Sequence, residues 1–250
     1  MPFTFAHPVA VMPWWNKTSL PVSALIIGSK SPDFEYFIRF RAAGVWSHDG
    51  AGIVLFNLPV IILLFLLFET VVRPALYVYL PDRFPYRWRR EGRIPGSFKG
   101  WFTVAVLGLA GTGTHLIWDQ FTHKGAWIVN HVSFLSGALT MGGLEVPVYK
   151  AAQHGSTLIG LIGTAWWIHR HLRVPADAAE DKQQGSTAPF WLTVLALFVL
   201  IFAIAAVFTA DGEGLAFLLQ LVVPAISSFM LAVLLTCLLF IKSIRKNRPV

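Results

Sequence analysis

Long apolar segments with almost no charge constrain this chain most. Residues 51–72 carry one charged side chain, Glu69, and further apolar stretches follow at 98–118, 154–168, 190–209 and 215–241. A helix needs about 20 apolar residues to cross a bilayer. Of the 250 residues, 55% are hydrophobic and 13% are charged, whereas soluble domains carry about 25% charged residues. We therefore expect an all-α fold, a polytopic membrane helical bundle with about five spans.

The N-terminal region differs from these segments. Residues 20–29 are apolar but too short to span a bilayer, which predicts a re-entrant or short helical segment. A cleavable signal peptide would have an uninterrupted apolar region near the start, whereas this segment contains Pro2, Pro8 and Pro13. We expect no such peptide here.

Charge in the connecting segments predicts the orientation. Basic residues gather in residues 73–99, in 169–173 and after residue 241, while 211–214 is acidic. Cytoplasmic segments carry the excess of Lys and Arg. Five spans would place all three basic segments in the cytoplasm, in an inner or cytoplasmic membrane, although Lys17, Lys30, Arg39 and Arg41 count weakly against this. The formal net charge of +7 then indicates membrane lipid as the partner, and no nucleic acid is expected.

The end of the second apolar stretch carries a histidine and aspartate motif. His115, Asp119 and His123 are each four residues apart. On an α-helix this spacing places all three side chains on one face. Imidazole and carboxylate are metal ligands, and two of them at this spacing can reach one ion. A hydrogen-bonded His–Asp pair at the membrane surface would show the same pattern.

Other candidate ligands fall at the same predicted membrane depth. His48 precedes the first span, His154 begins the third, and His7 and Asp33 lie in the N-terminal region. Ionisable residues at membrane spans are costly and usually functional. The sequence therefore predicts a metal site at the extracytoplasmic face. Asp33 as a helix N-cap and His154 as a cap of its span are the structural alternatives.

These features divide the chain into three parts. Residues 1–170 form the predicted metal-site membrane domain, with three spans and outer-face loops. Residues 171–189 form a cytoplasmic linker, and residues 190–250 form a two-span helical hairpin. Cys237 is the single cysteine, so neither an intrachain disulfide nor a thiolate zinc site is expected.

Three blocks carry a family resemblance: Met1-Pro-Phe-Thr-Phe-Ala-His-Pro8, Gly28-Ser-Lys-Ser-Pro-Asp-Phe-Glu-Tyr-Phe37 and Thr114-His-Leu-Ile-Trp-Asp-Gln-Phe-Thr-His123. Their order resembles an uncharacterised bacterial integral-membrane family up to about residue 170 of this chain. It is also similar, more loosely, to the membrane-bound metal-dependent hydrolases. The ligand order resembles that of zinc-dependent phospholipase C and the single-strand nucleases, in which a helical bundle holds three zinc ions over a phosphodiester.

The resemblance implies an assignment of ligands to ions. The first ion would take Asp33, His48, His115 and Asp119; the second His7 with bridging Asp119; the third His123 with His154. Leu158 stands where the soluble enzymes have an acidic residue, and Met1 shows no sign of being processed to a ligating amine. We therefore expect one or two zinc ions, or another divalent metal, in preference to three.

The leading functional hypothesis is a membrane-embedded metal-dependent hydrolase of a phosphoester or phospholipid. A zinc-type ion lowers the pKa of a bound water toward neutrality, and Asp33 or Glu35 would accept the proton as the catalytic carboxylate. The alternative is a non-enzymatic membrane protein that binds metal for transport, assembly or stability. A purely structural polar network is the third interpretation.

Overall fold

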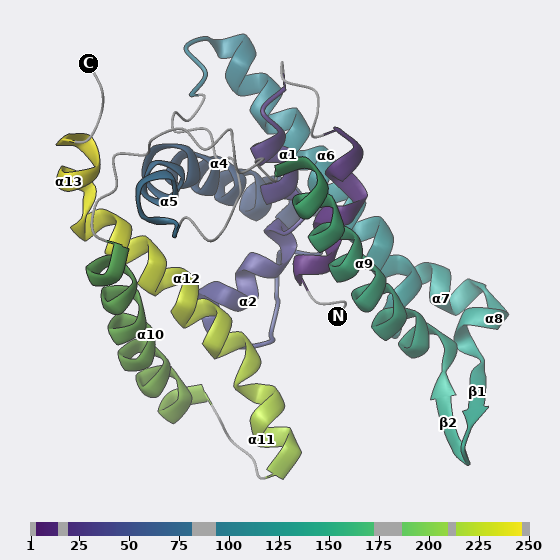
Figure 1. Cartoon of the computed structure of the whole chain (residues 1–250). Coiled ribbons are helices and arrows are strands. Elements are labelled where there is room, and N and C mark those ends of the chain that lie inside the picture. Colours follow the sequence, from purple (N-terminus) through teal and green to yellow (C-terminus); the bar gives the residue numbers. More distant parts are fainter. Residues whose placement is uncertain (1–3, 15–19, 82–93, 173–186, 210–213, 247–250) are drawn as a thin grey trace. The chain divides into compact units, whose positions relative to one another are not determined.

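The structure is a computed structural model of the whole chain and describes residues 4–14, 20–81, 94–172, 187–209 and 214–246. Apart from one short hairpin, the elements of this part of the chain are helices (Figure 1). Contacts divide the chain into two compact units. Unit 1 comprises Met1–Asp33, Trp46–Ile62 and Gly96–His171, and unit 2 comprises Phe34–Val45, Leu63–Pro95 and Leu172–Val250. The predicted division into residues 1–170, 171–189 and 190–250 stays a prediction.

Four helical stretches of the described residues are long and apolar enough to cross a membrane. They are Gly50–Tyr79, Phe98–His131, Thr187–Thr209 and Gly214–Leu239. Each overlaps one of the spans predicted at 51–72, 98–118, 190–209 and 215–241. The prediction of an all-α, membrane-helical fold is confirmed.

Two prolines shape the first of these stretches. It runs through α3 (Gly50–Gly52), the π-helix η3 (Ile53–Asn57), α4 (Leu58–Leu67), the π-helix η4 (Phe68–Val72) and α5 (Arg73–Tyr79). Pro59 and Pro74 each follow a π-helical segment by two residues. A proline lacks the N–H donor and clashes with the carbonyl four residues earlier, which here falls within the π-helix. The wider π turn accommodates that clash and keeps the helix continuous.

The predicted third span is helical but is not one of these four stretches. Residues 154–168 lie within α9 (Val148–Leu172), a helix of 25 residues that is not among the four stretches above. Four crossings, unlike five, would put the basic segments at 73–99 and after residue 241 on opposite sides of the membrane. Those four stretches alone therefore select no side for the candidate site.

Within unit 1, α1 (Val22–Gly28) packs against α6 (Phe98–Thr122) through glycines. A Cβ atom on Gly28 would lie 1.9 Å from the carbonyl oxygen of Gly108, and one on Gly111 would lie 2.2 Å from that of Leu25. Small residues allow helix backbones to approach this closely in membrane proteins. The apolar segment at 20–29 is thus a short helix whose buried residues lie against α6. This close packing brings the residues after α1 to the face of α6 that carries the motif.

Short elements lie between α6 and α9. They are α7 (Trp127–His131), α8 (Ser133–Ser136) and the antiparallel strands β1 (Ala138–Met141) and β2 (Leu144–Pro147). Figure 1 shows them at the end of α6, leading into the start of α9. Gly142 and Gly143 form the two-residue turn with φ of 57° and 82°. Both positions need positive φ in this type of hairpin, which glycine adopts without strain.

Unit 2 has its own apolar core. It contains α2 (Phe34–Arg39), α5, α10 (Thr187–Thr209), α11 (Gly214–Gln220), α12 (Val222–Leu239) and α13 (Ile241–Lys246). Tyr79 stacks on Phe190 with ring centroids 4.5 Å apart, and its carbonyl accepts a hydrogen bond from Trp191 Nε1 at 2.7 Å. These contacts join α5 to α10.

Candidate metal centre

The motif on α6 adopts the predicted arrangement. Asp119 lies between its two histidines, with Oδ2 3.3 Å from Nε2 of His115 and Oδ1 3.4 Å from Nδ1 of His123. His115 is buried, whereas His123 ends the helix as its C-cap and leaves 29% of its side chain exposed. The two oxygens of the Asp119 carboxylate therefore face two different histidines.

A backbone carbonyl orients His115. Its Nδ1 lies 2.9 Å from the carbonyl oxygen of Ser29, the residue that follows α1. A carbonyl only accepts hydrogen bonds, so Nδ1 carries the proton and a neutral ring presents the lone pair of Nε2. Metal-binding histidines are commonly held in this way.

Asp33 comes from the N-terminal region and is fully buried at the end of the 3₁₀-helix η2 (Ser31–Asp33). Its Oδ2 accepts a hydrogen bond from the hydroxyl of Thr4, in the 3₁₀-helix η1 (Thr4–Trp14). Its Oδ1 lies 3.6 Å from Nε2 of His115. Burial raises the pKa of Asp33 to about 6, opposed by His115 and by the Thr4 hydrogen bond.

His48 reaches the same carboxylates from the segment before α3. Its Nε2 lies 3.9 Å from Oδ1 of Asp33 and 3.7 Å from Oδ2 of Asp119, and 30% of its side chain is exposed. Its Nδ1 lies 2.9 Å from Oγ of Ser47, whose carbonyl accepts a hydrogen bond from the buried Asn57 side chain at 2.8 Å. The π-helix that contains Asn57 thus helps to hold the histidine segment in place.

Four donor atoms from three segments of the chain, two of them on α6, lie near one another. They are Oδ1 of Asp33, Nε2 of His48, Nε2 of His115 and Oδ2 of Asp119. Four distances among them lie between 3.3 and 3.9 Å. Tetrahedral ligands at zinc bond lengths lie about 3.3 to 3.6 Å apart, so these four distances lie within a few tenths of an ångström of those around one ion. The residues present therefore fit a divalent metal of the zinc type.

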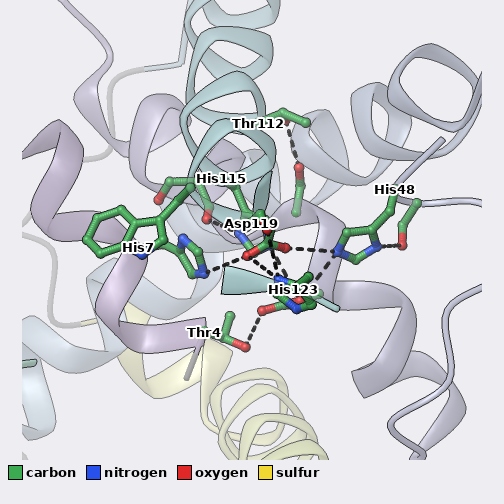
Figure 2. A network of polar contacts seen from close by, with 12 residues as sticks. Thr4, His7, His48, Thr112, His115, Asp119 and His123 are labelled. Carbon is green, nitrogen blue, oxygen red and sulfur yellow. Dashed lines mark hydrogen bonds and ion pairs between the residues drawn. The ribbon is translucent and has the colours of Figure 1, made fainter. Parts of the chain in front are cut away.

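His7 approaches from the opposite side. Figure 2 shows His7 and His48 on opposite sides of Asp119. The Nε2 atom of His7 lies 3.9 Å from Oδ1 of Asp119, and its ring stacks on that of His115 with centroids 3.8 Å apart. Burial, followed by the neighbouring histidine His115, lowers the pKa of His7 to about 3. The imidazole therefore stays neutral, which is the form that binds metal.

Six buried polar atoms of this cluster have no hydrogen-bond partner among the described residues. Among the described residues, no hydrogen bond reaches either ring nitrogen of His7, Oδ1 of Asp33, Nε2 of His115 or either carboxylate oxygen of Asp119. Unpaired buried polar groups are costly, and an ion is one of the explanations for them. All six atoms belong to Asp119, His115 or a residue whose side chain lies against one of these two.

Two predicted residues lie apart from these contacts. Among the described residues, two sets have ligand atoms within 4.8 Å of one another: His7, Asp33 and His115, and His48, His115 and Asp119. His154 is exposed on α9 and belongs to neither set. Glu35 is buried in α2 of unit 2, where its Oε1 accepts hydrogen bonds from Arg39 at 3.0 Å and from the Val45 amide at 2.8 Å. The third-ion role of His154 and the proton-accepting role of Glu35 stay predictions.

Four supporting residues were not anticipated from the sequence: Thr4, Ser29, Ser47 and Asn57. Ser29 acts through its backbone, which carries no residue-specific signal. Asn57 is a polar residue inside an apolar span, a pattern that marks a functional position. Asn57 could therefore have been singled out from the sequence alone.

Fold and cluster together define a helical membrane protein with a buried set of histidines and aspartates. The chain belongs to the family described as domain of unknown function DUF4184, whose model matches residues 1–238. No curated protein and no solved structure matches the chain. The family agrees with the expected resemblance to an uncharacterised group, and the similarity to hydrolases stays a prediction.

Proposed function

We propose that this protein is a membrane-embedded, metal-dependent hydrolase that cleaves a phosphoester, with phospholipids or other lipid-linked phosphates as the favoured substrates. The observation that supports it most is the convergence of Asp33, His48, His115 and Asp119, in which four distances between donor atoms lie between 3.3 and 3.9 Å. Two carboxylates balance the charge of one divalent ion. Histidine and carboxylate without cysteine are the ligands of catalytic zinc sites.

Asp119 is the proposed bridge to a second ion. Its Oδ2 faces the first ligand set, while its Oδ1 faces His7 and His123. The Nδ1 atom of His123 also lies 3.2 Å from the Asp119 carbonyl. His123 therefore has to give up its contact with the Asp119 carbonyl before its Nδ1 can bind metal. A second ion would consequently bind more weakly than the first.

The chemistry follows from this ligand set. Bound ions of this kind activate water near neutral pH and hold phosphoryl oxygens. His48 and His123 are the partly exposed members of the cluster, so they mark the side from which substrate and water would enter. Lys124 is exposed beside His123 and would attract an anionic phosphoester.

The membrane setting supports a lipid substrate. Ile117 and Phe121, on the same turns of α6 as the motif, are 64% and 44% exposed. They belong to a helix apolar enough to cross a bilayer. The cluster would therefore lie within reach of lipid phosphates.

Elemental analysis of the purified full-length protein in nanodiscs tests metal binding. We expect one or two zinc equivalents in the wild type and fewer than half of these in His115→Ala and Asp119→Ala, with His131→Ala as the matched control. His131 lies on α7, stacked on Trp127. A wild type without stoichiometric metal, including after zinc is supplied, would overturn the proposal.

Hydrolysis separates an enzyme from a metal-binding protein without catalysis. We expect cleavage of bis(p-nitrophenyl) phosphate or of fluorescent phosphatidylglycerol in vesicles, lost on chelation and restored by zinc. His131→Ala should keep this activity and Asp119→Ala should lose it. Stoichiometric metal without turnover of either probe would favour the non-enzymatic alternative.

A further inference from the structure

Helix α9 has its apolar residues on the outside. Leu158, Ile159, Ile162 and Trp166 are 59% to 70% exposed. Their spacing of one, four and eight residues places them on one face of the helix. A contiguous exposed stripe of this size is unusual on a face that meets water.

The opposite face of α9 carries small and polar residues and packs within unit 1. Gln153 is buried, and Ser156 accepts a hydrogen bond from Trp118 Nε1 of α6 at 3.1 Å. A Cβ atom on Gly160 would lie 2.7 Å from that of Ala6, and one on Gly163 would lie 2.7 Å from Cγ2 of Val9. The small and polar face thus meets α6 and η1, which is the reverse of a water-soluble amphipathic helix.

Charged residues border the apolar stripe at both ends. Lys150 is exposed in the first turn of the helix, and His169 and Arg170 are exposed near its end. At 1.5 Å per residue, Lys150 and Arg170 are about 30 Å apart along the axis, close to the thickness of the hydrocarbon core. Long basic side chains at such positions extend to the membrane surface.

We infer that α9 crosses the bilayer as a fifth span, with the stripe Leu158, Ile159, Ile162 and Trp166 against lipid acyl chains. Its average hydropathy is low because the polar residues of its buried face dilute the apolar outer face. Lipid is the occupant because the stripe has charged ends one bilayer apart and because the adjacent α6 is itself apolar enough to span. This inference does not depend on the proposed hydrolase activity.

A fifth span changes the topology. It places residue 150 and residue 170 on opposite sides of the membrane. The basic segments at 73–99, at 169–173 and after residue 241 then share one side, which the distribution of positive charge identifies as the cytoplasm. The end of α6 and the start of α9 face the other side.

Cysteine accessibility in the full-length protein tests this topology. In a Cys237→Ser background, single cysteines are introduced at Glu145, Ile162 and Arg170, and intact right-side-out and inverted vesicles are treated with a membrane-impermeant maleimide. We expect Glu145→Cys to be labelled only from the outside, Arg170→Cys only from the cytoplasmic side, and Ile162→Cys from neither. Labelling of Glu145→Cys and Arg170→Cys from the same side would overturn the inference.

Spin labels identify what covers the stripe. A label at Ile162 should collide often with oxygen and rarely with a water-soluble nickel complex, which is the signature of lipid. A label at the inward-facing Thr164, whose hydroxyl is buried, should collide rarely with both. High nickel accessibility at Ile162, or disulfide-linked dimers of Ile162→Cys, would replace lipid by water or by a second copy and overturn the inference. Unchanged elution of each variant on gel filtration controls for folding.

Discussion

The Nδ1 atom of His115 lies 2.9 Å from the carbonyl oxygen of Ser29, a residue 86 positions earlier in the chain. This contact fixes the ring so that Nε2 faces Asp33 and Asp119. It depends on the close crossing of α1 and α6, since Ser29 directly follows α1. The geometry of the candidate metal centre is therefore set partly by glycines that do not touch it.

Gly111→Ala should disturb this crossing. The added Cβ atom would lie 2.2 Å from the carbonyl oxygen of Leu25, so α1 has to move away and take the Ser29 carbonyl with it. We expect zinc affinity to fall roughly 10- to 100-fold, as for other losses of a contact that orients a ligand. Gly113→Ala on the same helix is the control, because nothing lies within 4 Å of its Cβ position. Equal zinc affinities in isothermal titration of the two variants would contradict this.

Asp119→Asn should remove more metal than His7→Ala. Asparagine keeps the size of the side chain but loses the charge that both proposed ions share, so we expect neither ion to bind. His7 faces Oδ1 of Asp119 and is assigned to the second ion in the proposed arrangement. His7→Ala should therefore keep one zinc equivalent in elemental analysis. Complete loss of metal from a folded His7→Ala protein would instead place His7 on the first ion.

Asp33 should make zinc binding depend on pH. A proton and a metal compete for its carboxylate, whose pKa is about 6 in the metal-free protein. The increase in melting temperature caused by zinc should therefore shrink as the pH falls through about 6. His7, with a pKa of about 3, should not contribute to this loss. A zinc-induced shift that stays constant down to pH 5 would contradict the prediction.

The raised pKa of Asp33 also predicts how the stability of the metal-free protein changes with pH. Because the folded pKa of Asp33 lies above the usual 3.8, the folded state binds this proton more tightly than the unfolded state. Its contribution to stability is fully present below about pH 4 and is lost as the pH rises toward about 6. In the Asp33→Asn variant the side chain at position 33 does not titrate. In chelator, the melting temperature of wild type relative to Asp33→Asn should consequently fall over this range.

Asn57→Leu tests the support of His48. The substitution removes the hydrogen bond from Asn57 to the Ser47 carbonyl, which leaves a buried acceptor without that donor. Loss of such a partner costs about 1 to 3 kcal/mol. We expect a lower melting temperature together with weaker zinc binding, because His48 follows Ser47 directly. Thr103→Val is the control in another span, since the exposed Thr103 hydroxyl binds only its own helix at Lys99.

Regular spacing and apolar length made much of this fold predictable. The stretches at 51–72, 98–118, 190–209 and 215–241 could be located because each is apolar on average, and the spacing of His115, Asp119 and His123 fixed their common face. The stretch at 154–168 was also located, but α9 is not among the four candidates because polar residues on one of its faces lower its mean hydropathy. The hairpin at Gly142-Gly143 was not predicted, although a Gly-Gly pair is a turn signal in hairpins.

Contacts between distant segments set the rest of the candidate site. Glu35 lies only two residues after Asp33, yet it belongs to unit 2 and binds Arg39. Thr4 and Ser29 reach the cluster through a hydroxyl and a carbonyl, groups that occur throughout any chain. Neither their direction nor their partner follows from spacing along the sequence. Only the packing of η1 and α1 against α6 determines them.

Packing of α9 against η1 should control His7. A Cβ atom on Gly160 would lie 2.7 Å from Cβ and 2.9 Å from the carbonyl oxygen of Ala6, the residue before His7. Gly160→Ala should therefore displace His7 and lose the same zinc equivalent as His7→Ala, while the first ion stays bound. Gly155→Ala on the same helix has nothing within 4 Å of its Cβ position and should bind zinc like the wild type. If Gly160→Ala and Gly155→Ala hold equal zinc in elemental analysis, the position of His7 does not depend on this contact.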